Sequence, residues 1–223
     1  PARIRRHVAA VYAFARCADD FADLPDGGSD AERLARLDDW ERSLDATVDG
    51  QVFSPEMEPS LERVKKNVFL ALGDTIRSHD LPVQPFRDLI AAFRQDVTVS
   101  RYQEYDDLLD YCRLSANPVG RIVLMLHGIR DEASFRASDA ICTALQIANH
   151  LQDVREDYLR GRVYLPESEL QAFGVSEKDL VGDTAGPVLR ALMVFQVRRV
   201  RDLFGEGLPL LKGTGGALSR ELR

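Results

Sequence analysis

Two pairs of aspartates repeat the same spacing in distant parts of the chain. Asp19 and Asp23 are four residues apart, and so are Asp153 and Asp157. Residues four apart share one face of an α-helix, with Cβ atoms ~5–6 Å from each other. Carboxylates held this closely repel one another unless a cation lies between them, and Mg²⁺ readily bridges carboxylates to a phosphate. The spacing therefore favours a site in which two or three Mg²⁺ ions surround a diphosphate.

Polar residues of a narrow range of types accompany each pair. Tyr12 and Arg16 precede the first pair on the same helical face, and Asp20 lies within it. Gln146 and Asn149 precede the second pair in the same way. We expect the two faces to converge across an apolar cleft. There the metal ions would neutralise a leaving diphosphate, and the helix walls would shelter a carbocation from water.

Two other interpretations of the acids are possible. A single aspartate string on a helix is usually exposed surface acid, but two pairs that both have polar partners make this explanation weaker. A di-iron helical bundle would need Glu-x-x-His pairs. The sequence has no Glu-x-x-His pair at any of its four histidines, His7, His79, His127 and His150. We interpret these as ordinary core or surface histidines.

Helical periodicity dominates the sequence, and no segment shows the period-two alternation of a half-buried strand. The predicted helices cover residues 4–23, 31–48, 60–79, 85–97, 105–130 with an interruption at Asn117-Pro118, 134–159, and 187 to about 204. Ser29 and Glu32 form a capping-box pattern before the second of these helices. We expect an all-α fold, with residues 1–223 forming one helical domain around a central apolar cavity.

Composition narrows the classes of function. The formal net charge of -7 does not fit a nucleic-acid-binding protein or a polybasic lipid-binding surface. Cys17, Cys112 and Cys142 are too widely spaced for a Cys-based zinc motif, and a reducing compartment is the simpler interpretation. No uncharged apolar run reaches the ~18 residues of a membrane span. We expect a cytoplasmic protein, and the sequence allows loose peripheral contact with a bilayer; no oligomeric state is predicted.

Three motifs together resemble those of the squalene/phytoene synthase family. YAFARCADDFAD, residues 12–23, resembles the family's first aspartate-rich motif, and NHLQDVREDYLRGRVYLP, residues 149–166, resembles the second. Tyr111-Cys112, followed by Val119-Gly120, resembles its central segment. The resemblance implies an isoprenoid-synthase-type helical bundle and Mg²⁺-dependent joining or rearrangement of prenyl diphosphates.

The resemblance also assigns roles by position. The implied metal and diphosphate ligands are Asp19, Asp20, Asp23, Asp153 and Asp157, and the implied substrate-binding residues are Tyr12, Arg16, Gln146, Asn149 and Tyr164. Tyr111 matches a tyrosine that assists proton transfer or stabilises cationic intermediates. Relative to the family, we expect this chain to lack an N-terminal and a C-terminal segment.

Within the family, residues 95–124 and 138–153 most resemble the bacterial branch of hopanoid biosynthesis that converts presqualene diphosphate and water into hydroxysqualene and diphosphate. That reaction needs no NADPH, and the sequence carries no dinucleotide-binding motif. Two departures from the wider family also favour the reaction that forms hydroxysqualene. Gln152 replaces a common Arg, and Ser115 and Asn117 place polar groups where the family is usually apolar. We interpret Ser115 and Asn117 as a patch that directs water to the cation; alternatively, Asn117-Pro118 only kinks a helix.

The same sequence features also allow other functions. The first is head-to-head condensation of two prenyl diphosphates to presqualene diphosphate or phytoene, which uses the same aspartate motifs. A terpene cyclase fits less well, because its second metal site normally mixes Asn, Ser and Glu. A non-catalytic assembly factor of the same fold is expected to have lost acids, whereas both pairs are intact here.

Overall fold

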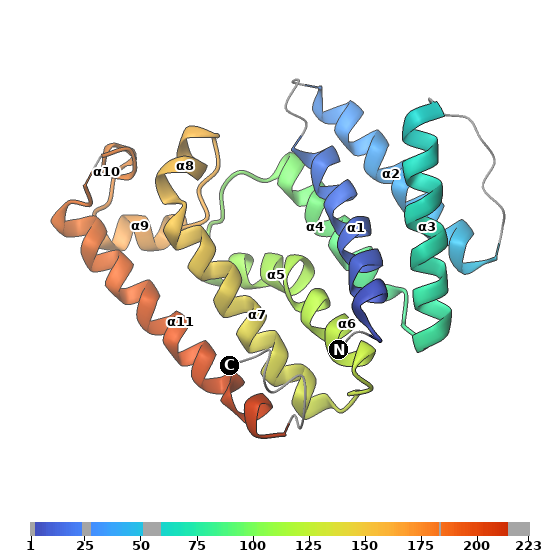
Figure 1. Ribbon diagram of the computed structural model, residues 1–223. Coiled ribbons are helices and arrows are strands. Elements are labelled where there is room, and N and C mark those ends of the chain that lie inside the picture. The colour runs from blue at the N-terminus through green and yellow to red at the C-terminus, as the bar shows by residue number, and fades with distance from the viewer. Residues whose placement is uncertain (1–2, 24–27, 51–58, 183, 214–223) are drawn as a thin grey trace. The chain divides into compact units, whose positions relative to one another are not determined.

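The computed structural model describes residues 3–23, 28–50, 59–182 and 184–213. In chain order the helices are α1 (Arg5–Ala22), α2 (Asp30–Val48), α3 (Pro59–His79), α4 (Gln84–Thr98), α5 (Tyr105–Ser115), α6 (Asn117–Leu126), α7 (Glu132–Gln152), α8 (Val154–Leu159), α9 (Glu167–Phe173), α10 (Glu177–Leu180) and α11 (Pro187–Gly213). Extended pairing within the described ranges is limited to an isolated parallel bridge between Arg101 and Val163. The predicted all-α fold is confirmed (Figure 1).

The helices form two compact units. The first comprises Pro1–Thr98 with Ile122–Ile129, and it contains α1 to α4 and the end of α6. The second comprises Val99–Arg121 with Arg130–Arg223, and it contains α5, the beginning of α6, and α7 to α11. Each unit places one of the two aspartate pairs.

An aromatic cluster forms the core of the first unit. Phe14 of α1 is fully buried, and its ring centroid lies 5.8 Å from that of Trp40, 6.0 Å from Phe69 and 5.5 Å from Phe86. These partners belong to α2, α3 and α4. Aromatic pairs at such distances add about 0.5–1.5 kcal/mol each beyond the burial of their surface. The cluster therefore fixes α1, which carries the first aspartate pair, against three other helices.

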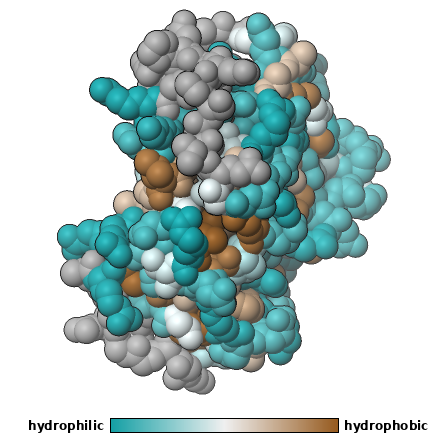
Figure 2. Space-filling view, turned by 90° about the vertical axis from the view of Figure 1, so that its right-hand side faces the viewer, coloured by the Kyte–Doolittle hydropathy of each residue, from teal (hydrophilic) through white to brown (hydrophobic). Residues whose placement is uncertain are grey.

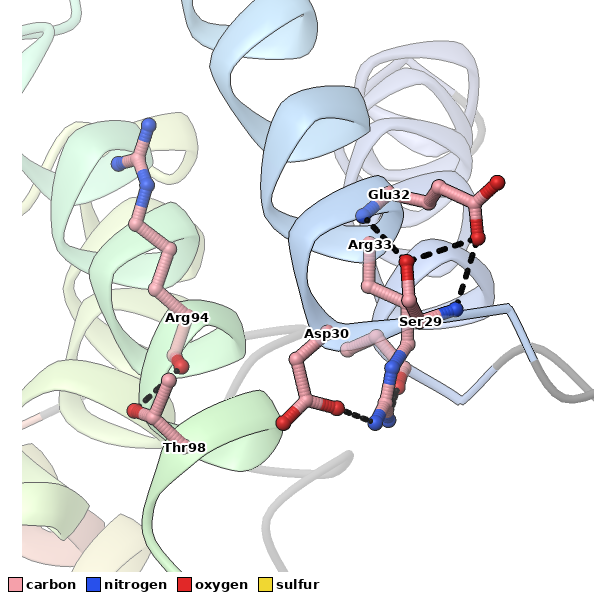
Figure 3. Close-up of polar contacts among 7 residues, drawn as sticks. Ser29, Asp30, Glu32, Arg33, Arg94 and Thr98 are labelled. Carbon is pink, nitrogen blue, oxygen red and sulfur yellow. Dashed lines mark hydrogen bonds and ion pairs between the residues drawn. The ribbon is translucent and has the colours of Figure 1, made fainter.

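The start of α2 is tied to the end of α1. Ser29 Oγ accepts a hydrogen bond from the Glu32 backbone N–H at 3.3 Å, and the Glu32 carboxylate accepts one from the Ser29 N–H at 2.8 Å, so the predicted capping box is confirmed. Arg33 pairs with Asp30 (Figure 3). Arg33 also donates a hydrogen bond to the Ala22 carbonyl at 2.9 Å. Arg33 thereby holds the last turn of α1 in place.

Helices α7 and α11 pack closely along their length in the second unit. At Gly207 of α11, a Cβ atom would lie 2.9 Å from Ile141 Cδ1 and 3.1 Å from the Ala137 carbonyl oxygen of α7. At Gly205, two residues earlier in α11, a Cβ atom would meet no atom within 4 Å. Only the first of these two glycines is therefore required by a close approach of the helices.

Several helix boundaries differ from the prediction; α6, for example, ends at Leu126 rather than at residue 130. The helix predicted over 134–159 is interrupted at Asp153, whose φ of -101° and ψ of 16° lie outside the helical region, so α7 ends there and α8 begins. The last helix continues past its predicted end near residue 204 to Gly213, because its packing on α7 supports a segment that is poor in intrinsic helix propensity. The short helices α9 and α10 were not predicted, since four to seven residues carry too little periodicity.

The face shown in Figure 2 is largely hydrophilic, with smaller hydrophobic areas between the polar side chains. Among the helices that the structure describes, none combines the length and the apolar character needed to cross a bilayer.

Candidate functional site

The first aspartate pair lies at the C-terminal end of α1. Asp19 is in the last turn, and Asp23 is the C-cap residue, whose backbone N–H donates to the Asp19 carbonyl oxygen at 3.0 Å. Arg16 pairs with Asp19 at 3.0 Å and with Asp20 at 2.5 Å. Tyr12 lies one turn earlier with 68% of its surface exposed. The predicted polar stripe on α1 is therefore present, and its arginine partly neutralises the acids.

The second pair surrounds the break between α7 and α8. Asp153 is the C-cap of α7 and the N-cap of α8, and the Asp157 N–H donates to its carbonyl oxygen at 2.8 Å. Asp153 and Asp157 therefore remain one helical turn apart, although the helix is interrupted at Asp153. The Asp157 side chain is only 17% exposed. Its burial, and then the negative charge of Asp153, raise the pKa of the Asp157 carboxyl. Both causes oppose the ionised form, and a bound cation would relieve them.

The position of the first pair on its helix also suits a cation. Asp19 and Asp23 lie at the C-terminal end of α1, where the peptide dipoles place partial negative charge. Carboxylates are normally favoured at the opposite end, and a cation near a C-terminal end contributes about 0.3–1 kcal/mol. The last turn of α1 contains no basic residue. Acids at these positions are therefore suited to binding a positive ion.

His150 is a site residue that the sequence analysis missed. The Gln146 side-chain nitrogen lies 3.2 Å from His150 Nε2, and His150 Nδ1 lies 4.0 Å from Asp157 Oδ2. An amide nitrogen can only donate, so Nε2 accepts and the ring proton is on Nδ1, facing Asp157. Burial lowers the pKa of His150 to about 4, so the ring is neutral at pH 7 and the contact with Asp157 is not an ion pair. The sequence feature that could have identified His150 is its position four residues after Gln146, on the same face of the helix.

Three tyrosines build an aromatic wall beside His150. The Tyr164 ring stacks on His150 with a centroid distance of 3.6 Å and an interplanar angle of 12°. Tyr111 lies 5.9 Å from Tyr164, and Tyr102 lies 5.8 Å from Tyr164 and 5.6 Å from Tyr111. The structure thus brings together the predicted residues Tyr111 and Tyr164 with Tyr102, which sequence analysis did not single out.

Backbone contacts fix the segment that carries Tyr164. The Val163 N–H donates to the Ser100 carbonyl at 2.9 Å, and the Arg101 guanidinium donates to the Gly161 carbonyl at 2.7 Å. Gly161 has a φ of +86°, a conformation in which glycine is favoured, so the chain can turn sharply after α8. The turn brings the wall back against α7.

Other predicted residues of the second unit occupy distinct positions. Asn149 is exposed on the last turn of α7, and its carbonyl accepts the Asp153 N–H at 3.0 Å. Asn117 Oδ1 accepts a hydrogen bond from Thr143 Oγ1 at 2.9 Å, which joins the start of α6 to α7. Ser115 Oγ is buried and has no hydrogen-bond partner among the described residues. The convergence of the two aspartate pairs stays a prediction.

The donor sets fit Mg²⁺ that is shared with a substrate. Within the described residues, no three His, Cys, Asp or Glu side chains gather closely enough to hold a metal ion by themselves. Mg²⁺ does not need such a cage, because it usually keeps several waters and is bound through one or two carboxylates together with substrate phosphates. Each aspartate pair is of this kind.

The fold and the paired aspartates define an isoprenoid-synthase-type helical protein. The squalene/phytoene synthase family model matches residues 1–223. A hydroxysqualene synthase of Sinorhizobium fredii is 36% identical over 99% of this chain and 68% of its own length, and a 15-cis-phytoene synthase of Synechococcus elongatus is 35% identical over 92% of this chain and 66% of its own length. The chain belongs to the squalene/phytoene synthase family.

A solved structure supports the same relationship. The crystal structure of squalene synthase HpnC from Alicyclobacillus acidocaldarius matches 100% of this chain and 78% of that chain, with a TM-score of 0.86 and 39% sequence identity. These relatives indicate a prenyltransferase-type enzyme. The chain spans between 46% and 68% of the length of these curated relatives.

Proposed function

We propose that this chain catalyses the Mg²⁺-dependent conversion of presqualene diphosphate and water into hydroxysqualene and diphosphate. The observation that carries the proposal is the second aspartate pair: a half-buried carboxylate with a raised pKa lies beside a neutral histidine and a wall of tyrosines. These surroundings suit a reaction in which a diphosphate leaves while it is bound to a metal cation. The carbocation then forms against the faces of the aromatic rings. Similarity to hydroxysqualene synthases of three bacteria supports the choice of reaction.

The residues that would hold Mg²⁺ are Asp19, Asp20 and Asp23 on α1 with Asp153 and Asp157 at the α7–α8 junction. When bound, Mg²⁺ stabilises the negative charge that develops on the diphosphate as its C–O bond breaks. We propose that both groups of acids serve the same diphosphate. This assignment rests on the acids' placement at helix ends and on family membership.

Other residues bind and orient the substrate in this proposal. Arg16 and Tyr12 extend along α1 from the acids and offer a guanidinium and a phenol to the diphosphate. Gln146 orients His150 by donating a hydrogen bond to Nε2, which leaves the ring N–H directed at Asp157. Tyr111 and Tyr164 face the forming cation, whose charge the negative faces of their rings stabilise.

The polar patch at the start of α6 is proposed to favour capture of the cation by water. The buried hydroxyl of Ser115 lies four residues after Tyr111, on the same face of α5, and has no protein partner among the described residues. Asn117 is engaged by Thr143, so its contribution is to hold the patch in position.

Head-to-head condensation of two prenyl diphosphates is the second candidate, favoured by the similarity to phytoene synthases. One experiment separates the two. Purified protein with Mg²⁺ and without NADPH is given presqualene diphosphate or farnesyl diphosphate. Hydroxysqualene from the first and no product from the second are expected. Presqualene diphosphate formed from farnesyl diphosphate would support condensation instead.

A control tests whether the protein is an enzyme at all. A non-hydrolysable diphosphate analogue should raise the melting temperature in the presence of Mg²⁺, because a ligand that binds only the folded state stabilises it. Absence of both turnover and this stabilisation would point to a non-catalytic assembly factor.

A further inference from the structure

A small pocket opens beside His150 in the second unit. His150 and Tyr164 line it together with Leu108 of α5, Ile147 of α7 and Gln196 of α11. The space in it that is open to the centre of a water molecule is about 10 Å³. A cavity needs roughly 10–15 Å³ by this measure to hold one water. The pocket therefore has the size of a water site rather than of a site for a prenyl chain.

Gln196 is the unusual residue of this pocket. Only 1% of its surface is exposed, and its Oε1 atom has no hydrogen-bond donor among the described residues. A buried carbonyl oxygen without a donor is unfavourable by about 1–3 kcal/mol. His150 and Tyr164 also line the pocket, and neither donates to Gln196 Oε1. His150 already accepts a hydrogen bond at Nε2 and directs its N–H to Asp157.

The orientation of the Gln196 amide is determined by its neighbours. Its nitrogen donates to the Glu169 carboxylate, which also accepts from Arg199. The Arg199 guanidinium is itself held over the ring of Tyr105, 4.1 Å from the centroid. A carboxylate can only accept, so the amide nitrogen must face Glu169 and the amide oxygen must face the other way. The network thus holds an acceptor in place at the pocket.

We infer that Gln196 Oε1 binds a water molecule in this pocket and that this water captures the carbocation in the proposed reaction. The inference rests on the proposed function. Gln196 accepts one O–H of the water, which leaves an oxygen lone pair free to form the new C–O bond. The resulting oxonium loses a proton to the diphosphate that the reaction releases. The C–O bond to the diphosphate is broken and the C–O bond to water is formed, so the products are one alcohol and one diphosphate that carries the proton, and atoms and charge balance.

The position of the pocket suits this role. His150 lies 4.0 Å from the half-buried aspartate of the second pair and stacks on Tyr164, so the pocket adjoins both the proposed diphosphate site and the aromatic wall. The Ser115 hydroxyl is seven residues along α5 from Leu108, or about 10 Å at the rise of an α-helix. Ser115 and Gln196 therefore mark two rival places for the water that captures the cation, and substitutions at each can distinguish them.

The test compares products from presqualene diphosphate. Gln196→Met keeps the volume of the side chain and removes the acceptor. Glu169→Gln keeps Gln196 but gives it a neighbour that can donate, so the amide oxygen becomes engaged. Val197→Met is the matched control, because Val197 is an exposed neighbour on the same helix. Circular dichroism and melting temperature establish that each variant is folded.

Both test variants should continue to release diphosphate, with the ratio of alcohol to hydrocarbon products lowered about tenfold, since one hydrogen bond to the water is lost. The control should keep the wild-type ratio. Unchanged ratios in the test variants would overturn the inference, whereas failure of the wild type to release diphosphate would overturn the proposed function instead. A crystal structure of the wild type gives an independent readout: ordered water on Gln196 Oε1 supports the inference, and its absence among otherwise ordered internal waters contradicts it.

Discussion

The burial of His150 predicts a specific loss of stability in acid. The folded state lowers the pKa of this ring from 6.5 to about 4, because burial disfavours the imidazolium. Below pH 6.5 the unfolded chain takes up a proton that the folded chain resists. The stability that the neutral ring contributes is therefore complete above pH 6.5 and is lost progressively as the pH falls to about 4. With 1.36 kcal/mol per pKa unit, the difference amounts to about 3 kcal/mol. The side chain is only 12% exposed, so solvent screening reduces this figure little.

The assay is urea unfolding of the metal-free protein at several pH values between 7 and 4, compared with His150→Phe. Phenylalanine can still stack on Tyr164 but cannot titrate. The free energy of unfolding should fall more steeply for the wild type, by about 3 kcal/mol over this range. His7 also has a pKa lowered by burial, but it is present in both proteins and cancels in the comparison. Parallel curves for the two proteins would refute the buried, neutral His150.

Three further predictions concern packing, metal binding and product choice. Gly205→Ala should stabilise the protein by about 0.5–1 kcal/mol, whereas Gly207→Ala should destabilise it by about 1–3 kcal/mol because its Cβ meets α7; thermal unfolding would show shifts of opposite sign. Asp153→Asn should lower turnover by orders of magnitude without unfolding the protein, and near-normal diphosphate release would contradict its role as a metal ligand. Ser115→Ala combined with Asn117→Leu should shift products from alcohol towards hydrocarbon, and an unchanged hydroxysqualene yield would remove the polar patch from the mechanism.

The fold was predictable from sequence where local signals were strong. The capping box at Ser29 and Glu32 placed the start of α2 within one residue, and the apolar periodicity of α1 gave both its ends. The signals failed where packing determines the backbone. Gly205 and Gly207 both argue against a helix, yet α11 runs through them because Gly207 permits close contact with α7. No local pattern reveals such a contact between residues more than sixty positions apart.

The candidate site was likewise predictable from the sequence only in part. The two aspartate pairs and Tyr111 could be singled out from spacing and resemblance, because those features are local in the sequence. His150 and Gln196 could not, because their roles depend on burial. The pKa of His150 falls only when α7 is covered, and Gln196 becomes a fixed acceptor only when Glu169 and Arg199 are brought to α11.

The neutral state of His150 explains how the second aspartate pair can serve a cation. Burial and the negative charge of Asp153 both disfavour the ionised Asp157 carboxylate. His150 does not offset these terms, because at neutral pH it carries no charge. A protonated histidine there would compete with a metal ion for the aspartates. By keeping the ring neutral, the fold leaves the negative charge of the second pair available to a cation, and the acid stability of the protein is lowered in consequence.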